Sequence, residues 1–317
     1  MARPDPWRNG NPTTASTPFT MISLVTTCMN REKHLRQSVR MWVKLPSIDE
    51  ILIVDWSTRE SIDDLLDFDP RIRIVRAEGE PRWVQTYASN LGIAQARGDI
   101  ILKCDADCMP TPAVMNLRPA AGRYYAGDWH SGAAAGKICV NGQCLFTRDQ
   151  WQQVNGYSEL IRHYAHDDTD FYDRMIACGQ TRLEITPDLL TFLPHTDGDR
   201  VVNFQTGQAS YDTVESFLYS QLPYHEAINK LIAGLIPWGP WFQRAAFAPV
   251  GGDGRLLRVK RDTSLEIPLS ESLQQLARAQ AIRAITARVC KIPPPVFARM
   301  DDAACLVQLG RLIKKTA

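Results

Sequence analysis

The sequence predicts an α/β fold in which a mostly parallel sheet is flanked by helices and followed by a helical C-terminal extension. Three observations support this prediction. Short apolar, β-branched segments alternate with amphipathic segments over residues 21–107. Several of the apolar segments end in residues that carry hydroxyl or carboxyl groups. From about residue 205 the spacing of apolar residues becomes helical. Since strands separated by helices pair through crossovers, such alternation favours a parallel sheet covered on both faces.

The first part of this pattern contains three strands and one helix. Residues 21–28 (MISLVTTC) form a short apolar run that is typical of a buried strand. Residues 31–45 have helical spacing, because their apolar side chains fall on one face. Two further strands are predicted at residues 49–57 (DEILIVDWS) and 71–77 (RIRIVRA).

A second helix and a fourth strand follow. Residues 83–98 predict a helix that runs through about Ala96, with Gly98 as its C-terminal stop. Residues 99–107 (DIILKCDAD) predict the strand. Residues 111–150 look largely irregular.

Three more segments complete the α/β part. Residues 142–157 predict a strand and then a short helix that ends near Gly156. Residues 167–179 predict a helix that has an aspartate as its N-cap and Gly179 as its C-terminal stop. Residues 181–195 predict one or two strands.

The chain therefore divides into three predicted parts. Residues 1–19 are a flexible leader, residues 20–204 form the α/β domain, and residues 205–317 form a mainly helical region. Within the last part, residues 271–290 and 301–315 have the clearest helical spacing.

Composition narrows the class of protein. The chain has 317 residues, 44% of them hydrophobic, and a formal net charge of +1. No overall field directs it toward nucleic acid. The eight cysteines form no C-x-x-C pair, which favours reduced thiols and a cytosolic setting. The N-terminus lacks an apolar signal core, and no segment reaches the ~20 apolar residues that span a bilayer, so we expect a soluble protein.

Polar groups follow three of the predicted strands. They are Thr26 and Thr27, then Asp55, then Asp105 and Asp107. In parallel sheets ligands bind beyond the carboxyl ends of the strands. The pattern therefore predicts a binding site at this rim of the sheet.

The Asp105-Ala-Asp107 segment could hold a metal ion. Residues i and i+2 of an extended segment face the same way, and paired carboxylates suit Mg²⁺ or Mn²⁺ completed by substrate phosphates. His195 also follows an apolar segment, and its imidazole could complete a Mn²⁺ site. The alternatives are a solvated turn for the aspartates and a packed or surface histidine.

The acidic segment HYAHDDTDFYDR (163–174) has two interpretations. Its aspartates could simply cap a helix, because carboxylates favour the free N–H groups of a helix N-terminus. One carboxylate could instead act as general base for an acceptor hydroxyl, while its neighbour binds a sugar. His163, Tyr164 and His166 would add a stacking surface and hydrogen-bond donors beside them.

These segments, taken in order, resemble nucleotide-sugar glycosyltransferases of the Rossmann-like GT-A fold, close to the family-2 type. SLVTTCMNR resembles the opening strand and loop of that family, and ILIVDWSTRES resembles its VVDDGSTD segment. NLGIAQARGDIILKCDAD resembles its RNxGxxxAxGxxxxxLDAD segment. The positions that the resemblance assigns to the nucleotide sugar are Thr26, Thr27, Asp55, Asn90 and Asp105.

The resemblance implies a role for three of these aspartates. Asp55 would contact the base of the nucleotide. Asp105 would contact the ribose or the metal ion, and Asp107 would bind the metal and the diphosphate.

A later segment, VNGYSELIRHYAHDDTDFYDRM, resembles the NGYxxxFxGWGGEDDDLxxRL segment of β-1,4-galactosyltransferase-like enzymes. The match gives Asp167 the acceptor-binding acidic position and Asp168 the position of the catalytic base. His195 falls where a metal-binding histidine follows in those enzymes. The implied reaction is a metal-dependent, inverting transfer of a sugar from a nucleoside diphosphate, UDP above all, to a hydroxyl of a glycan or lipid-linked acceptor.

The chain departs from the family pattern at three places. Trp56 replaces the second aspartate of DDGS, and Ser89 replaces the arginine of RN. Residues 163–166 (HYAH) stand where GWGG is expected. These changes leave the donor sugar and the acceptor undefined.

Tryptophans offer further sugar contacts. Trp129 and Trp83 could stack on a sugar or on the uracil ring, and Trp129 is the stronger acceptor candidate. Trp151 is predicted to pack in the core.

Residues 229–247 are apolar, contain two tryptophans and are interrupted twice by proline. They could touch a membrane surface, which would place a cytoplasmic protein at the inner face of the membrane. They could instead pack on the catalytic domain or close a homodimer.

Two other functions remain open at this point. A nucleotidyltransferase acting on a sugar phosphate would share the metal site, but the loop TTCMNREKH lacks the usual glycines. A non-catalytic carbohydrate-binding subunit would not need the retained acidic residues. A dinucleotide-dependent oxidoreductase is disfavoured, because no G-x-G-x-x-G motif is present.

Overall fold

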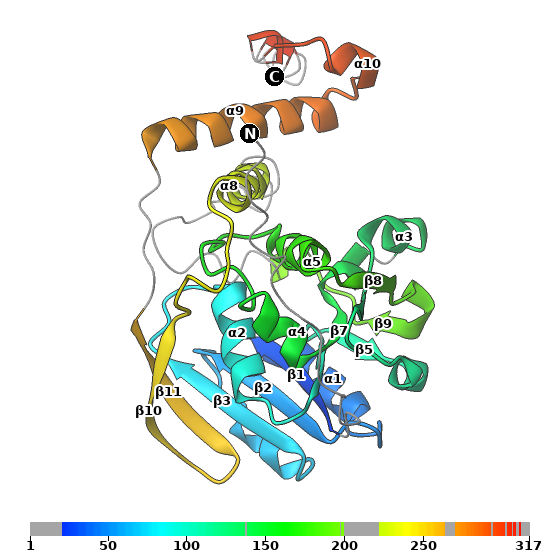
Figure 1. The fold of residues 1–317 in the computed structure, drawn as a ribbon, viewed down its shortest axis with the longest axis vertical. Coiled ribbons are helices and arrows are strands. Elements are labelled where there is room, and N and C mark those ends of the chain that lie inside the picture. The colour runs from blue at the N-terminus through cyan, green and yellow to red at the C-terminus, as the bar shows by residue number, and fades with distance from the viewer. Residues whose placement is uncertain are drawn as a thin grey trace.

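The predicted alternation of strands and helices is present in a computed structural model of the protein (Figure 1). The structure describes residues 21–136, 138–196, 198–199, 222–263 and 270–292, and beyond these 294–301, 303–305, 307–308 and 311. The predicted leader and much of the predicted helix at 301–315 lie outside the described residues.

The centre of the sheet consists of four parallel strands, β1 (Ile22–Cys28), β2 (Glu50–Trp56), β3 (Ile72–Glu78) and β4 (Ile100–Lys103). They lie in the order β3-β2-β1-β4. Every residue of β2 and β4 is buried, as expected for strands that are covered on both faces. Since the chain leaves β1 toward β2 on one side and later returns to β4 on the other, a crevice opens between the ends of β1 and β4.

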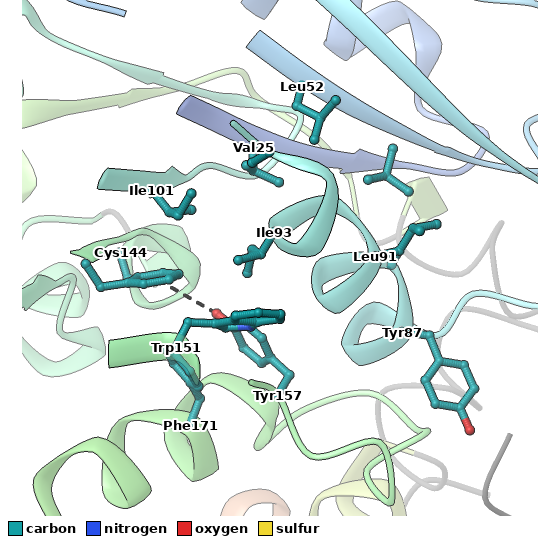
Figure 2. Close-up of a cluster of buried hydrophobic side chains, with 14 of the residues drawn as sticks. Val25, Leu52, Tyr87, Leu91, Ile93, Ile101, Cys144, Trp151, Tyr157 and Phe171 are labelled. Atoms are coloured by element: carbon teal, nitrogen blue, oxygen red, sulfur yellow. Dashed lines mark hydrogen bonds between the residues drawn. The ribbon is translucent and has the colours of Figure 1, made fainter. Parts of the chain in front are cut away.

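Two helices cover opposite faces of these strands. Helix α1 (Glu32–Trp42) buries Leu35, Val39 and Trp42, and the indole of Trp42 donates a 2.9 Å hydrogen bond to the carbonyl of Cys108. Helix α2 (Gln85–Gln95) packs into a second apolar cluster. Figure 2 shows this cluster around α2, with Val25 and Leu52 on the strands and Leu91 on the helix. The predicted core position of Trp151 is confirmed, because its side chain is only 2% exposed there.

Close packing fixes the role of two glycines of this region. A Cβ on Gly92 of α2 would lie 2.7 Å from Val54 and 2.8 Å from Val25. Helix α2 ends at Gln95, and Gly98 does not form its stop. Gly98 is instead required by a close approach, since a Cβ there would lie 2.7 Å from the backbone nitrogen of Ser23.

The sheet continues beyond β4 through shorter strands. These are β7 (Cys144–Thr147), β6 (Arg123–Ala126) and β8 (Thr181–Glu184), and a separate pair is formed by β5 (Cys108–Pro110) and β9 (Leu190–Phe192). The short helices are α3 (Trp129–Ala134), α4 (Arg148–Gln153) and α5 (Asp167–Ala177). The prediction that 111–150 is largely irregular was therefore partly wrong, because β6 and α3 are too short to give a clear period.

The predicted strands and helices of 142–195 are confirmed, with one exception at the start of α5. Gly179 has a φ of +83° and ends the helix as expected. The N-cap of α5 is His166 with a φ of +70°, so the prediction of an aspartate cap was wrong.

The C-terminal region adds a hairpin to the sheet, which its helical spacing did not indicate. Strand β11 (Leu256–Thr263) pairs in parallel with β3, and β10 (Ala246–Asp253) pairs antiparallel with β11 (Figure 1). Val259 of β11 is 2% exposed and belongs to the same cluster as α2. The hairpin escaped the sequence analysis because β10 contains Pro249 and two glycines, and most of its residues are exposed.

The remaining helices of this region are α8 (Leu222–Leu235), α9 (Glu271–Val289) and the short α10 (Pro294–Phe297). The helical prediction for 271–290 is confirmed. Helices α8 and α9 pack together over a small apolar cluster on the side of α5 (Figure 1). The division of the chain near residue 204 stays a prediction. None of the described helices combines the length and the apolar character needed to cross a bilayer.

The close approach of α2 to the sheet predicts that Gly92→Ala destabilises the protein, although alanine is the better helix former. The added methyl group must displace two valines, whose branched side chains have little freedom. We expect a loss of about 1–3 kcal/mol of unfolding free energy in urea denaturation.

Gly234→Ala is the matched control for this substitution. Gly234 also lies in a helix, but a Cβ there would meet no atom within 4 Å. The Gly234→Ala protein should gain up to about 1 kcal/mol of unfolding free energy from helix propensity alone. A Gly92→Ala protein as stable as this control would contradict the packing described.

Candidate active site

A cavity of about 400 Å³ lies at the carboxyl ends of β1 and β4, at the crevice that the sheet topology creates. Its wall is built from strand ends, the N-terminus of α5, the loop before α5 and the segment after β9. Among the residues that line it are Thr27, Arg31, Lys103, Asp105, Asp107, His163, Tyr164, Asp167, Asp168 and His195.

Asp105 and Asp107 follow β4 directly and reach the cavity from different directions. One carboxylate oxygen of Asp105 accepts a 2.8 Å hydrogen bond from the side-chain amide of Gln143, and the other lies 3.5 Å from Lys103 Nζ. The carboxylate of Asp107 faces Arg31 and His195 instead.

The small β5–β9 pair explains how His195 reaches Asp107 across 88 positions of sequence. Cys108 pairs with Phe192 in this ladder, and the amide of Leu193 donates a 2.8 Å hydrogen bond to the carbonyl of Asp107. The chain then turns so that His195 Nε2 lies 3.4 Å from Asp107 Oδ2.

The environment of Asp107 is mixed in charge. Burial and the nearby Asp105 carboxylate raise the pKa of Asp107, while Arg31 and His195 oppose that rise. Arg31 Nη2 donates a 2.9 Å hydrogen bond to Asp107 Oδ2. The carboxylate thus already carries a cationic partner at the position where a metal ion would bind.

The donor atoms at this point fit a divalent cation in part. Asp107 Oδ2 and His195 Nε2 are 3.4 Å apart, close to the ~3 Å that separates neighbouring ligands of an ion bound at about 2.1 Å. The Nδ1 atom of His195 is buried without a hydrogen-bond partner in the described structure. No group of three His, Cys, Asp or Glu side chains in the described residues is already arranged around one point. Two protein ligands suffice for Mg²⁺ or Mn²⁺ when substrate phosphates complete the shell.

Asp167 and Asp168 begin α5 and point their carboxyl groups toward the same cavity. A helix N-terminus favours carboxylates there, because its first N–H groups lack helical partners. Asp168 Oδ1 accepts hydrogen bonds from Lys103 Nζ at 3.2 Å and from the hydroxyl of Tyr157 at 3.4 Å.

Lys103 is the cation that joins these carboxylates. Its side chain is 4% exposed, and Nζ donates a 2.7 Å hydrogen bond to the carbonyl of Gly142 in addition to its contacts with Asp168 and Asp105. Burial opposes the charge of Lys103, but the carboxylates of Asp168 and Asp105 raise its pKa above the ordinary value. Lys103 is therefore a buried ammonium ion.

Burial also shifts the pKa values of the two aspartates at the start of α5. It raises the pKa of Asp168, which Lys103 opposes. Burial, followed by the charge of Asp168, raises the pKa of Asp167 to about 7. Both carboxyl groups are therefore harder to ionise than exposed aspartates, and Asp167 titrates near neutrality.

Several predicted residues do not reach the cavity wall. Thr26 and Asp55 are buried behind it, and the Asp55 carboxylate is bound by Thr58 and Arg76. Trp129 is 52% exposed, packs in a tilted arrangement on His130 and is not among the residues that line the cavity. Their predicted contacts with substrate stay predictions, and Trp83 is the tryptophan that lines the cavity.

Asn90 is also buried, and its contacts are internal. Its Nδ2 donates 2.9 Å hydrogen bonds to the carbonyl of Tyr157 and to Glu159, and its Oδ1 accepts one of 2.8 Å from the amide of Tyr157. A Cβ on Gly156 would lie 2.4 Å from Asn90 Oδ1. Asn90 thus connects α2 to the segment that leads into the loop before α5.

Sequence reasoning missed three lining or supporting residues, Lys103, Arg31 and Gln143. Lys103 carried a usable signal, because a lysine inside the buried strand IILK requires an anionic partner. Arg31 and Gln143 carried none, since both occupy loops or turns in which polar residues are ordinary.

The fold and the cavity define an α/β enzyme whose site lies at a sheet rim and carries carboxylates beside a candidate cation position. The family described as glycosyl transferase family 2 matches residues 23–184, just over half of the chain, and the chain belongs to that family. No curated protein matches the chain in sequence.

Three solved structures are similar to the chain at low sequence identity, and the first of them supports the fold. Drosophila β1,4-galactosyltransferase 7 is 12% identical, with a TM-score of 0.50 over 77% of this chain and 95% of that chain. A mannosyltransferase from Pyrobaculum calidifontis is 13% identical, with a TM-score of 0.46 over 69% of this chain and 79% of that one. Glucosyl-3-phosphoglycerate synthase from Mycobacterium tuberculosis is 14% identical, with a TM-score of 0.45 over 72% and 85%. The predicted glycosyltransferase class and GT-A fold are confirmed.

The raised pKa of Asp167 predicts how Asp167→Asn changes stability with pH. The folded protein holds this proton up to about pH 7, whereas an unfolded aspartate releases it near 3.9. The carboxyl group therefore costs no stability below its unfolded pKa and an increasing amount as the pH rises to about 7. In urea unfolding with EDTA present, the advantage of the asparagine variant over the natural protein should be larger at pH 8 than at pH 5.

Asp69→Asn is the control, because its effect on the free energy of unfolding should have the opposite sign. A hydrogen bond from Arg71 lowers the pKa of Asp69, so this substitution should reduce stability at pH 8. An Asp167→Asn advantage that is equal at both pH values, or larger at pH 5, would contradict the assigned environment.

Proposed function

We propose that the protein is a divalent-cation-dependent, inverting glycosyltransferase. It moves a sugar from a nucleoside diphosphate, with UDP favoured, to a hydroxyl group of a glycan or other acceptor. The observation that carries this proposal is the convergence of Asp105, Asp107, Asp168 and His195 on one cavity. These side chains come from three separate parts of the chain, and a structural role would not require them to share one wall.

The comparison of folds agrees with these substrate classes. The Drosophila galactosyltransferase was solved with manganese, UDP-Gal and xylobiose. That enzyme therefore holds a cation, a nucleotide sugar and a glycan on a fold shared with this chain. The proposal assigns the same three classes of ligand to the cavity at the end of β1 and β4.

The donor side of the site is formed by the residues around Asp107. Asp107 and His195 would hold Mn²⁺ or Mg²⁺, with Asp105 close by for the ribose or for the ion. When bound, the cation supplies positive charge that offsets the charge building on the departing diphosphate. Arg31 donates to the same carboxylate oxygen of Asp107, so it would give up this contact to a bound ion and could then bind an anionic group of the donor.

The acceptor side is formed by the first turn of α5. Asp168 removes the proton from the acceptor hydroxyl as the oxygen attacks the anomeric carbon from the face opposite the diphosphate. A single displacement of this kind inverts the configuration. Lys103 and Tyr157 hold Asp168 Oδ1, which leaves the other carboxylate oxygen for the proton.

The floor of the acceptor site would be made by Asp167, His163 and Tyr164, which line the cavity beside Asp168. Trp83 lines the same cavity and offers a stacking face for a sugar. Trp129, which is exposed elsewhere, would need an extended acceptor to take part.

The segment 229–247 supports packing more than membrane contact. Trp238 is fully buried, stacks on Phe242 at 5.0 Å and donates a 2.8 Å hydrogen bond to the carbonyl of Asn155. Leu235 and Trp241 are 62% and 56% exposed. A lipid-linked acceptor, a peripheral position at the inner membrane face and a homodimer through this segment remain predictions.

Asp168→Asn should spare donor binding while it collapses turnover. The amide keeps the shape of the carboxylate but cannot accept the proton, so kcat should fall by about 10²–10⁴-fold. Turnover of a panel of UDP-sugars with Mn²⁺, together with calorimetric titration of UDP, measures both quantities.

Asp173→Asn is the matched control, since Asp173 lies on the same helix and is exposed. It should retain turnover and UDP affinity. If Asp168→Asn keeps turnover within a few-fold of the natural protein, the general base has been assigned to the wrong residue.

The proposed cation site predicts a thermal shift that depends on two side chains. Mn²⁺ with UDP should raise the melting temperature of the natural protein, because a ligand at 100 times its Kd adds about 2.7 kcal/mol to stability. EDTA should abolish the shift and any turnover. Asp107→Ala and His195→Ala should each lose most of it, whereas Asp173→Asn should keep it. An unchanged shift in both alanine variants would place the ion elsewhere.

A further inference from the structure

The loop before α5 is held in an unfavourable backbone conformation. Ala165 and His166 have φ values of +76° and +70°, in the left-handed region that favours glycine. Two consecutive residues with Cβ atoms therefore occupy positions for which glycine would cost nothing, and other contacts must hold them there.

One side chain of α8 supplies those contacts. Asn229 is fully buried, and its Nδ2 lies within hydrogen-bond distance of three successive carbonyl oxygens of the loop. Its two N–H groups are shared among the carbonyl oxygens of His163 at 3.2 Å, Tyr164 at 3.1 Å and Ala165 at 2.7 Å. Three carbonyls that converge on one amide nitrogen define the path of the loop over these residues.

A ring contact adds to the same junction. The imidazoles of His163 and His225, the latter from α8, stack at 4.5 Å with an interplanar angle of 19°. Burial lowers the pKa of His163 to about 4 and that of His225 to about 3. Both rings are therefore neutral near pH 7, and no like-charge repulsion opposes the stack.

The loop fixes the catalytic end of α5 as well as the cavity wall. The amide of Asp170 donates a 2.9 Å hydrogen bond to the carbonyl of His166, so the first turn of the helix begins from the constrained residue. Asp167 and Asp168 lie within that turn. His163, Tyr164 and the loop backbone line the cavity beside them.

We propose that Asn229 is a positioning residue for the acceptor site, and that α8 is part of the machinery that selects the acceptor. The convergence of its amide on three loop carbonyls carries this inference, which rests on the proposed function. The chain thus holds this loop with a clamp from its C-terminal region. Residues outside the family-2 segment at 23–184 then shape the acceptor site.

The test compares Asn229→Leu and Asn229→Ala with Lys230→Ala in the full chain. Leucine keeps the approximate shape of asparagine without its donors, and alanine serves if leucine prevents folding. Lys230 is the next residue of α8, but its side chain is 52% exposed and pairs only with Glu226 on the helix surface in the described structure. It controls for any general effect on α8.

The first measurement needs no substrate. Limited trypsin digestion followed by mass spectrometry reports cleavage after Arg162, the residue that precedes the clamped loop. Both Asn229 variants should be cleaved there at least tenfold faster, and Lys230→Ala should be cleaved at the natural rate. Adding Ala165→Gly to either Asn229 variant should return much of the resistance, because glycine removes the steric cost of the left-handed conformation. Unchanged cleavage in the Asn229 variants would overturn the proposal.

The second measurement compares the effect of the Asn229 variants on acceptor binding with their effect on donor binding. Transfer from UDP-galactose or UDP-glucose to p-nitrophenyl β-glycosides should show a KM for the glycoside raised at least tenfold in the Asn229 variants. Their affinity for UDP with Mn²⁺ should remain within twofold of the natural value. A rise in both constants by the same factor, together with a collapse of the melting temperature, would show a merely structural role and would overturn the proposal.

These measurements distinguish a failure of the proposed function from a failure of the positioning role of Asn229. A natural protein that transfers no sugar from any UDP donor would contradict the proposed function, while faster cleavage after Arg162 would still establish the clamp. A natural protein that transfers sugar, with unchanged glycoside KM in the Asn229 variants, would contradict only the positioning role.

Discussion

The site depends on one buried ammonium group. Lys103 Nζ contacts Asp168 at 3.2 Å and Asp105 at 3.5 Å, and its remaining donor is taken by the carbonyl of Gly142. Without this charge the carboxylates of one buried wall would repel each other, and most would bind protons instead of cations or acceptor hydroxyls. The register of β4 between β1 and β7 sets the position of Lys103, so the chemistry of the rim follows from the pairing of the central strands.

The other parts of the site are supplied by elements that are far apart in sequence. The β5–β9 ladder brings His195 to Asp107, and α5 presents Asp168 to the same cavity. Helix α8 then supports the loop in front of α5 through Asn229. In the proposed function the donor side lies on the sheet rim, where the family match covers Asp105 and Asp107 but not His195, and the acceptor wall also depends on the C-terminal region. Such a division would let the acceptor change while the donor site is kept.

Much of this arrangement could be predicted from sequence, for reasons that differ between residues. The buried strands were found because apolar, β-branched runs have few alternatives, and Asp105, Asp107, Asp168 and His195 were found because their order matched a family. The internal contacts of Asn90 and Asp55 could not be predicted, since a motif position does not show whether a side chain faces a cavity or the core. The β10–β11 hairpin was missed because Pro249 and its neighbouring glycines obscure a strand whose pairing with β3 is distant in sequence. Tertiary contacts, such as the one between Asn229 and Ala165, leave no local pattern at all.

The central claim is that one cation and one nucleotide sugar meet at the ends of β1 and β4. Anomalous diffraction at the manganese edge, from crystals grown with Mn²⁺ and UDP, tests it most directly. The account predicts a single strong peak within about 2.3 Å of Asp107 and His195, with the diphosphate on its open side and Arg31 displaced from Asp107. A manganese peak bound only by other residues, or UDP bound away from this cavity, would contradict it.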